Sequence, residues 1–306
     1  MGSRALFRFE FRAMAAEHEI QLYADTRADA ERAAQAAIAD IARVEAKYSR
    51  YRDDSVTARI NRAAGTTPVA IDAETAALLR FADHCFELSE GRFDITSGAL
   101  RRAWNFAARP PRLPSPAEVS GAQALIGWPR VEWDSNAIRL PQAGMEIDFG
   151  GIGKEYAADR AATICIEHGV VQGLVNLGGD VRAIGGQADG SPWRIGIRDP
   201  RAPERAIAGL DVIDGAVATS GDYERGFELD GRRYCHILNP RTGMPVAHWR
   251  SVSVVAPLCI VAGSGATIAM LLEERALEFL DSQRLDYCAV DREGKIYRPT
   301  AIAAST

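Results

Sequence analysis

The stretch that decides the fold is Gly215–Pro245, GAVATSGDYERGFELDGRRYCHILNPRTGMP. Its first residues form a short apolar run that predicts a buried strand ending in a TSG corner at 219–221. The pair at 230–231, Asp-Gly, predicts a hairpin turn into a second strand that carries His236. That strand ends in the turn NPRTG at 239–243. One hairpin would therefore bring hydroxyls, glycines, a histidine and an arginine together, as a phosphate-handling site requires.

Composition places the chain among soluble globular proteins, with 306 residues, 47% hydrophobic and 25% charged. This length allows a single domain over residues 1–306, or one built from two intimate lobes. The formal net charge is -5, and no Lys/Arg-rich stripe with interleaved aromatic residues occurs. We therefore expect no nucleic-acid partner.

The cysteines and the hydropathy pattern bear on the compartment. Five cysteines are scattered singly, which argues against a disulfide framework or a zinc site and favours buried thiols in a reducing compartment. No stretch approaches the ~20 apolar residues that span a bilayer, and the first residues show no signal-peptide pattern. The sequence thus predicts a cytoplasmic protein without membrane insertion.

Secondary-structure signals alternate between strands and long helices. We expect a half-buried strand at 17–23, a helix capped by Asp25, and another capped by Asp72 that stops at Gly91. Phe93-Asp94-Ile95-Thr96 should lead into a helix with Trp104, and Ile147 and Phe149 should form a strand before a helix that opens at Lys154. Further strands are expected from 174 to the turn at 176–180, at 193–199 and in 251–257, and a last helix begins near 259. These elements predict an α+β fold of mainly antiparallel, twisted sheets with helices packed on them.

Glycine-rich turns are the other candidate ligand sites. The run GGIGK at 150–154 is not a Walker A loop, because its first glycine is misplaced and Glu155 stands where Ser or Thr is required. The triplet DFG at 148–150 has no kinase catalytic-loop partner, and no GxGxxG follows a strand in a βαβ unit. Glycines before a helix N-terminus can nevertheless hold phosphate.

Taken together, these segments resemble the FAD:protein FMN transferase (ApbE-type flavin transferase) family over residues from about 14 to 272. The matching motifs are FD-x-T at 93–96, D-x-G-G-x-x-K at 148–154, NLGGD at 176–180, and the TSG and NPRTG turns. The resemblance implies an ApbE/T-fold-like architecture and FAD as the bound substrate. It also implies a set of FAD contacts, comprising Met14, Tyr51, Asn61, Phe93, Asp94, Thr96, Gly151, Lys154, Gly178, Gly179, Asp180, Thr219, Ser220, Gly221, His236, Arg241, Thr242 and Gly243.

The activity that the resemblance implies is transfer of FMN from FAD to a Thr or Ser hydroxyl of an acceptor flavoprotein domain, with release of AMP. Such a transfer needs neutralised phosphates, reacting oxygens in line and a group that takes the hydroxyl proton. His236 has a suitable intrinsic pKa and is the candidate catalytic base. Two alternatives remain open: an FAD pyrophosphatase that yields FMN and AMP, and a non-catalytic FAD-binding protein.

The resemblance also implies a divalent metal, expected to be Mg²⁺. The family holds it with an Asp and a Thr on the last helix, and Thr267 matches, but Gly263 stands where the family has the aspartate. The other expected ligands are Asp180 or a backbone carbonyl near Gly153. Glu155, where the family usually has glycine, is our candidate for the missing carboxylate, although an acidic residue in a first helical turn is also favoured by the helix dipole alone.

Overall fold

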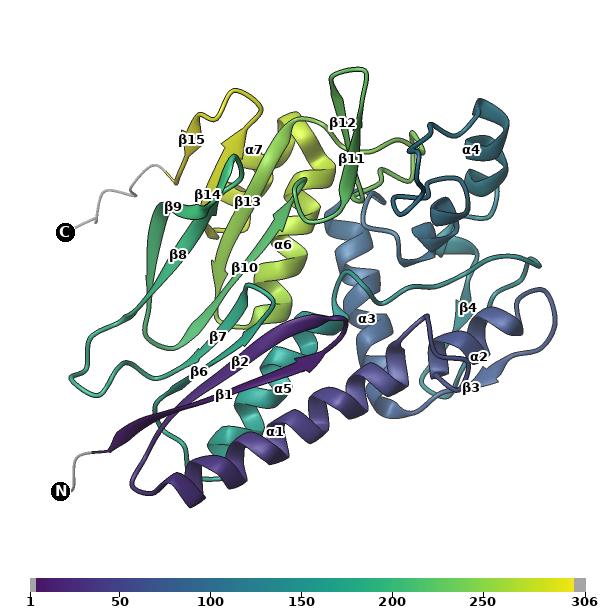
Figure 1. Ribbon diagram of the computed structural model, residues 1–306. Coiled ribbons are helices and arrows are strands. Elements are labelled where there is room, and N and C mark those ends of the chain that lie inside the picture. Colours follow the sequence, from purple (N-terminus) through teal and green to yellow (C-terminus); the bar gives the residue numbers. More distant parts are fainter. Residues whose placement is uncertain (1–3, 300–306) are drawn as a thin grey trace.

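An eight-stranded sheet, in the order β1-β2-β6-β7-β10-β13-β14-β15, forms the centre of the molecule (Figure 1). The computed structural model describes residues 4–299, apart from the side chain of Pro203. All neighbouring strands pair antiparallel. The strands are β1 Ala5–Ala13, β2 Ala16–Ala24, β6 Gly173–Leu177, β7 Asp180–Ile184, β10 Gly215–Gly221, β13 Trp249–Ala256, β14 Asp286–Asp291 and β15 Ile296–Tyr297.

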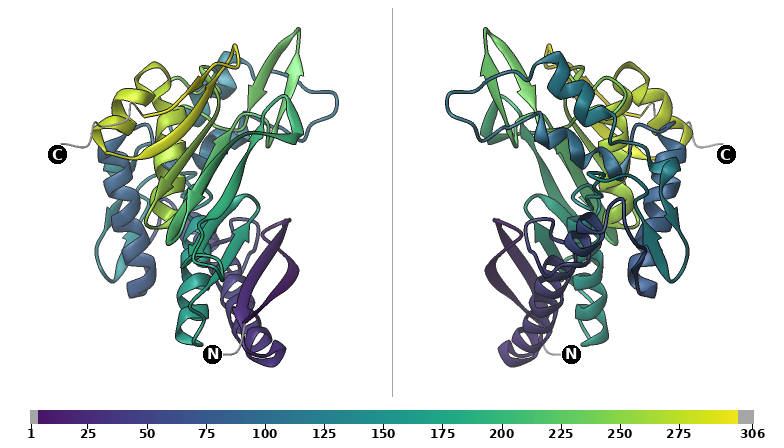
Figure 2. Two further views of the ribbon diagram at one scale, coloured as in Figure 1. Left: turned by 90° about the vertical axis from the view of Figure 1, so that its left-hand side faces the viewer. Right: turned by 90° about the vertical axis from the view of Figure 1, so that its right-hand side faces the viewer.

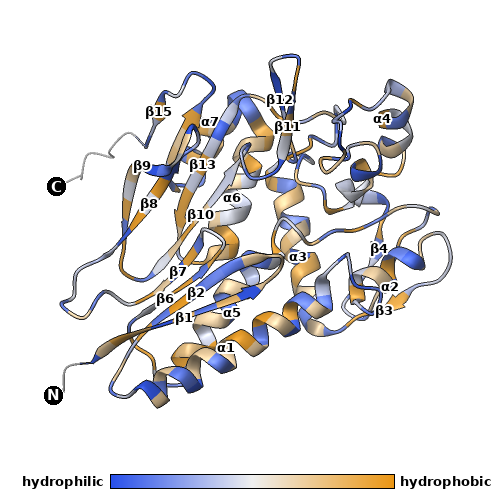
Figure 3. Ribbon diagram, viewed as in Figure 1, coloured by the Kyte–Doolittle hydropathy of each residue, from blue (hydrophilic) through white to orange (hydrophobic). Residues whose placement is uncertain are grey.

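Three long helices, α1 (Arg27–Tyr48), α5 (Gly153–Glu167) and α6 (Cys259–Leu272), cover one face of this sheet (Figures 1 and 2). The contact face of α1 is rich in alanine, so α1 and α5 approach closely. In Figure 3, α6 carries none of the strong blue that interrupts α1, since twelve of its residues are buried. Its first amides, at Cys259 and Ile260, donate to the Asp159 carboxylate of α5 at 2.8 and 2.9 Å.

The opposite face of the sheet is covered by the hairpin of β8 (Trp193–Asp199) and β9 (Ala202–Val212). Strand alternation produces both cores. On β6, for example, Val175 belongs to the core under the helices, while its neighbour Leu174 packs with the hairpin. The central strands are therefore apolar on both sides, as their sequences predict.

Of the remaining elements, the helices α2 (Val56–Arg62), α3 (Ala73–Leu88) and α7 (Ala276–Ser282) pack into the core under the long helices, and others form a second cluster beside the sheet (Figure 1). A small aromatic core there stacks Trp104 and Phe106 on Phe227 and Tyr234. The other remaining elements are the helix α4 Pro116–Gln123; the 3₁₀ helices Ile95–Arg102, Trp128–Arg130 and Glu273–Arg275; the strands β3 Val69–Ala70, β4 Glu132–Trp133 and β5 Ala137–Arg139; and the hairpin β11 Gly226–Leu229 with β12 Arg232–Cys235.

The predicted α+β class with antiparallel sheets is confirmed, and so are the cap of α3 at Asp72 and, to within one residue, the starts of α5 and α6. The helix that begins near 259 is not the last, because α7 follows it. The cap of α1 was misplaced by one residue: Thr26, not Asp25, accepts from the Asp29 amide at 3.2 Å. The single-domain description of residues 1–306 stays a prediction. Across residues 4–299, no helix combines the length and apolar character that crossing a bilayer requires. All five cysteines are free and buried.

Three local predictions were wrong. The strand at Ile147 and Phe149 is absent; these side chains are buried, but the amide and carbonyl of Ile147 bond to the side chain of Asn61 instead of a neighbouring strand. Trp104 lies just beyond its 3₁₀ helix. His236 follows β12, which ends at Cys235, and β12 pairs with β11 while β10 pairs with β7 and β13. The TSG corner and His236 therefore come from different sheets.

Candidate active site

The TSG corner ends β10 and is joined by hydrogen bonds to three neighbouring elements. The Thr219 amide donates to Asp180 at 3.1 Å, and its hydroxyl pairs with that of Ser253 at 2.7 Å. The Ser220 hydroxyl lies 2.7 Å from the Thr267 hydroxyl on α6. The corner is thus a hydroxyl-lined junction between β7, β13 and α6. It brings together Thr219, Ser220, Asp180 and Thr267, all of which the sequence singled out.

Lys154 and Asp180 form an ion pair of 2.6 Å beside this junction. Burial acts to lower the pKa of Lys154, but the carboxylates of Asp180 and Glu155 outweigh it and hold that pKa above its usual value. The lysine therefore stays charged. Asp180 is 4% exposed at its side chain and is held by both Lys154 and the Thr219 amide, so the pair is a fixed charge arrangement.

His236 is half-buried, and only one of its two ring nitrogens lies next to a hydrogen-bond partner within the chain. Its Nδ1 lies 3.2 Å from the carbonyl oxygen of Arg225. When Nδ1 carries the proton and donates to that carbonyl, Nε2 is left as an acceptor. Burial, chiefly, and then the cations of Arg225, Arg101 and Lys154 lower the pKa of His236 to about 4. The imidazole is therefore neutral at physiological pH, as a general base must be.

The turn at Gly150–Gly153 offers fewer free amides than its sequence suggests. The Gly150 amide donates to Asp148 at 2.9 Å, and the amides of Ile152 and Gly153 both donate to the carbonyl of Phe149. Asp148 in turn pairs with Arg50 at 3.1 Å and with Arg101 at 2.6 Å. Gly151 packs against the Phe93 ring, where an added Cβ would come within 3.1 Å of Cζ. Three of the four amides in this turn therefore already have acceptors within the chain.

Glu155 reaches from α5 to Gly263 on α6. A Cβ at position 263 would lie 2.5 Å from Cγ and 2.9 Å from Oε1 of Glu155. The Glu155 side chain is buried, and within residues 4–299 its Oε2 has no hydrogen-bond partner. Burial, chiefly, and the nearby Asp180 raise the pKa of Glu155 well above its ordinary value. This carboxyl group is therefore buried, short of hydrogen bonds and shifted towards its neutral form.

Comparison with known proteins assigns this arrangement to a family. The model of the ApbE family matches residues 14–289. The chain belongs to the ApbE family. A Vibrio cholerae protein named FAD:protein FMN transferase is 32% identical over 247 residues, covering 79% of this chain and 74% of the relative. A Treponema pallidum protein of the same name is 35% identical over 246 residues, covering 74% and 68%.

Solved structures agree with this assignment. The ApbE protein from Thermotoga maritima superposes with a TM-score of 0.87 at 32% identity, covering 96% of this chain and 97% of that one. The flavinyl transferase ApbE of Pseudomonas stutzeri, in its apo form, gives a TM-score of 0.85 at 29% identity, with coverage of 97% and 96%. The ApbE fold expected from the sequence is confirmed.

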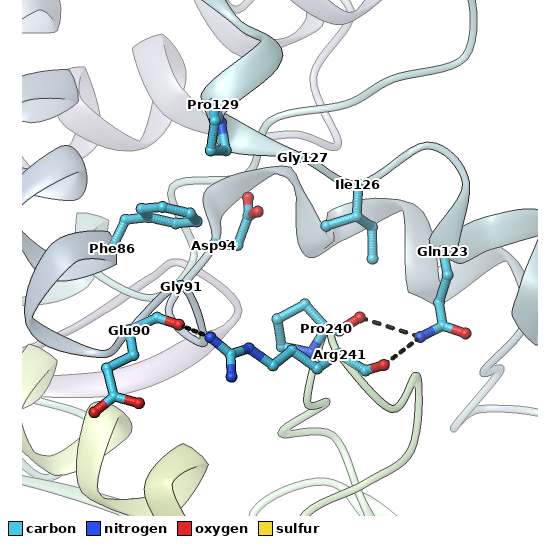
Figure 4. A pocket seen from close by; sticks show the side chains of 10 residues that line it. All are labelled: Phe86, Glu90, Gly91, Asp94, Gln123, Ile126, Gly127, Pro129, Pro240 and Arg241. Atoms are coloured by element: carbon cyan, nitrogen blue, oxygen red, sulfur yellow. Dashed lines mark hydrogen bonds between the residues drawn. The ribbon is translucent and has the colours of Figure 1, made fainter.

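The FD-x-T motif of this ApbE protein borders an open pocket of about 560 Å³ (Figure 4). Asp94 caps the 3₁₀ helix at the Thr96 amide, with 2.7 Å between the atoms, and also accepts from the Trp128 amide at 3.1 Å. Burial raises the pKa of Asp94 in spite of these bonds. The pocket is lined by Phe86, Glu90, Gly91, Asp94, Gln123, Ile126, Gly127, Pro129, Pro240 and Arg241.

The NPRTG turn closes the other side of this pocket. The Arg241 guanidinium donates to the carbonyl of Glu90, as Figure 4 shows, and has no bond to the TSG corner. Trp104 Nε1 donates to the Gly243 carbonyl at 2.7 Å, and the Met244 amide donates to the Thr242 hydroxyl at 3.2 Å. The polar groups of the turn are therefore partly used in holding it in place.

The other expected FAD contacts lie in three places. Met14 is in the β1–β2 turn, and Gly178 and Gly179 form the β6–β7 turn, where φ is +63° and +98°. Because β2 pairs with β6, these two turns belong to adjacent hairpins at one end of the sheet. Tyr51 is 77% exposed, with the Arg50 guanidinium 5.8 Å from its ring centroid. The side-chain amide of Asn61 is hydrogen-bonded to the backbone amide and carbonyl of Ile147, so the role of Asn61 in FAD binding stays a prediction.

Three residues that sequence reasoning missed belong to this region. Tyr223 lies over Gly221, where an added Cβ would come within 2.5 Å of its ring. Burial, chiefly, raises the pKa of Tyr223 to about 12, so its hydroxyl stays protonated. Arg101 and Arg225 lie close enough to His236 to influence its pKa. Tyr223 and Arg225 could have been suspected from their position between the TSG corner and His236, whereas no sequence signal marks Arg101.

Proposed function

We propose that this ApbE protein transfers FMN from FAD to a Thr or Ser hydroxyl of an acceptor flavoprotein domain and releases AMP. Membership of a family whose curated members are named FAD:protein FMN transferase supports this activity. The observation in the site that carries the proposal is a neutral, half-buried histidine, His236, amid the cations of Arg101, Arg225 and Lys154. A base can take the proton of an attacking hydroxyl, and nearby cations can stabilise the negative charge of the phosphate under attack.

In this reaction the acceptor oxygen forms a bond to the phosphorus of the FMN half, and the bond from that phosphorus to the AMP oxygen breaks. The Nε2 atom of His236 accepts the proton of the attacking hydroxyl. Arg101 and Lys154 attract the pyrophosphate, while Asp180 holds Lys154 in place. The Lys154 amide in the first turn of α5, and the hydroxyls of Thr219 and Ser220 on leaving their present partners Ser253 and Thr267, would orient phosphate oxygens.

Mg²⁺ belongs to the proposal because it would neutralise pyrophosphate charge and so favour departure of AMP. Within residues 4–299, no three His, Cys, Asp or Glu side chains gather as a ready metal site. The donors that fit a hard cation are oxygens: the Thr267 hydroxyl, a carbonyl near Gly153 and the buried Glu155 carboxylate with its partnerless oxygen. Phosphate oxygens of FAD would complete the shell.

One incubation tests this proposal. Purified protein is mixed with FAD, Mg²⁺ and a candidate acceptor domain, and the flavin products are followed by in-gel fluorescence and chromatography. Fluorescence that stays with the denatured acceptor, together with AMP, is the expected result. Free FMN with AMP would instead mean hydrolysis, and unchanged bound FAD would mean binding alone. Chelation of the metal and an acceptor with its hydroxyl removed are the matched controls.

The cytoplasm is our proposed location, supported by the five free, buried cysteines. The proposed partner is the acceptor flavoprotein domain.

A further inference from the structure

Glu155 and Gly263 are complementary in shape. Gly263 lies inside α6, where its backbone is helical and has no need of a glycine. Glycine in a helix interior costs about 1 kcal/mol relative to alanine, so its presence calls for a packing reason. The reason is the Glu155 side chain, whose Cγ would lie 2.5 Å from any Cβ at 263. Gly263 is therefore a notch in α6 that admits the carboxylate from α5.

The carboxylate in this notch is short of partners. The Glu155 residue is 7% exposed, and Oε2 has no hydrogen bond within the described residues. The adjacent cation, Lys154, is already paired with Asp180 at 2.6 Å, and the other charged neighbour on α5, Asp159, is acidic. A buried charged group is strongly destabilising unless an opposite charge or hydrogen bonds compensate it. Within the described part of the chain, Asp180 and Glu155 thus share a single neighbouring cation, Lys154, whose ion pair is with Asp180.

The notch also sets where the carboxylate points. Thr267 follows Gly263 by one helical turn, so both positions share a face of α6. The Thr267 hydroxyl bonds to Ser220 in the TSG corner. A carboxylate lodged at Gly263 therefore lies on the side of α6 that faces the proposed phosphate site.

We propose that Glu155, reaching through the Gly263 notch, supplies the carboxylate ligand of the divalent cation, so that this ligand comes from α5 and not from α6. The inference rests on the proposed FAD site and deepens it. It makes the two departures from the resembled motif, glutamate at 155 and glycine at 263, a matched exchange between two packed helices. A bound cation would compensate the negative charge that Glu155 carries once it has lost its proton.

Cation binding is measured directly, without any transfer reaction. Mn²⁺ is titrated into the FAD-loaded protein without acceptor, and free Mn²⁺ is read by electron paramagnetic resonance, with FAD alone as the blank. Glu155→Gln keeps the side-chain size and is expected to weaken Mn²⁺ binding by ~10-fold or more, since an anionic ligand is lost. Glu167→Gln, at the exposed end of the same helix, is the control and should bind Mn²⁺ as the parent does. Equal Mn²⁺ affinity for Glu155→Gln and the parent would overturn the inference, as would a parent that binds no Mn²⁺.

Reciprocal substitution tests the exchange itself. Gly263→Asp alone places a side chain against Glu155 and should lower the melting temperature by several degrees. Glu155→Gly alone should lose Mn²⁺ binding, and the double variant Glu155→Gly/Gly263→Asp should recover most of it. A double variant that melts like the parent yet binds Mn²⁺ no better than Glu155→Gly would refute the exchange. FAD binding, followed by flavin fluorescence in the same samples, separates this failure from a failure of the FAD site itself.

Discussion

Gly243→Ala should destabilise the protein far more than the same change at Gly231. Both glycines have a left-handed backbone, with φ of +68° at Gly243 and +72° at Gly231. Around Gly231, at the tip of the β11–β12 hairpin, nothing lies within 4 Å of an added Cβ. At Gly243, that Cβ would fall well inside 3.0 Å of Val119 on α4 and 3.0 Å from Cδ of Gln123.

The difference between the two variants isolates the packing cost. A left-handed alanine costs ~1–2 kcal/mol, partly offset by ~0.4–1 kcal/mol from a stiffer unfolded chain, and both terms apply equally at the two sites. Overpacking adds ~1–3 kcal/mol at Gly243 only, because Val119 is short and buried and cannot swing aside. We expect the free energy of unfolding to fall by ~1 kcal/mol in Gly231→Ala and by ~2–4 kcal/mol in Gly243→Ala.

Urea unfolding followed by tryptophan fluorescence measures the loss of unfolding free energy in each variant. The two values are comparable if the unfolding free energy falls with urea concentration at the same slope in both variants. Trp104, which donates to the Gly243 carbonyl, reports on the turn directly. If the two variants unfold at the same urea concentration, the NPRTG turn does not dock on α4 as described, and the reasoning fails.

Three further predictions concern the chemistry. His236→Ala should lower transfer by ~10²-fold or more while FAD binding stays largely intact; a variant that transfers at the parent rate would make His236 merely structural. Because the pKa of His236 is lowered to about 4, kcat/KM should stay flat from pH 7 to about 5.5, where an ordinary histidine would be ~90% protonated. A fall in kcat/KM with an apparent pKa near 6.5 would contradict the role of His236 as the base. Because the imidazole of His236 is protonated near pH 6.5 in the unfolded chain but only near pH 4 in the folded one, the stability contributed by neutral His236 is lost as pH falls from about 6.5 towards about 4. FAD should bind more tightly than FMN, since several glycine turns suggest a cleft for both phosphates and adenine; equal affinities in calorimetry would contradict that cleft.

Helices were predicted well because their signals are local. The Asp72 side chain accepts from the Thr75 amide at 2.9 Å, as its place before an apolar-periodic segment indicated. At α1, Asp25 and Thr26 are both competent caps, and only the backbone decides between them. Ile147 and Phe149 alternate with polar residues like a strand, but a side chain, Asn61, takes the place of a partner strand. Periodicity records burial, and it cannot tell which group satisfies the backbone.

The site was predicted as a set of residue types, but the partners of each group were not predictable. The glycine turn before α5 looked like a phosphate cradle, yet the Gly150 and Gly153 amides already have acceptors within the chain. Lys154 looked like a free cation and is paired with Asp180. The Lys154–Asp180 pair joins distant segments, and the amide bonds to Asp148 and Phe149 depend on the exact backbone conformation of the turn, so neither is visible as a sequence pattern.

Glu155 and Gly263 are a second case in which the sequence alone does not show which residues lie next to each other. Along the sequence, each residue departs from the motif that surrounds it: Gly263 alone suggests a lost metal ligand, and Glu155 alone could be either a replacement ligand or a residue favoured by the helix dipole. The packing of α5 on α6 places the Glu155 side chain against Gly263, so either residue explains the other. A glycine-to-aspartate reversion at 263 alone would therefore damage the site that it was meant to restore, because the space it needs is already filled. Whether the glycine at 263 means a lost carboxylate ligand or one moved to another helix depends on the residues of the helix packed against it.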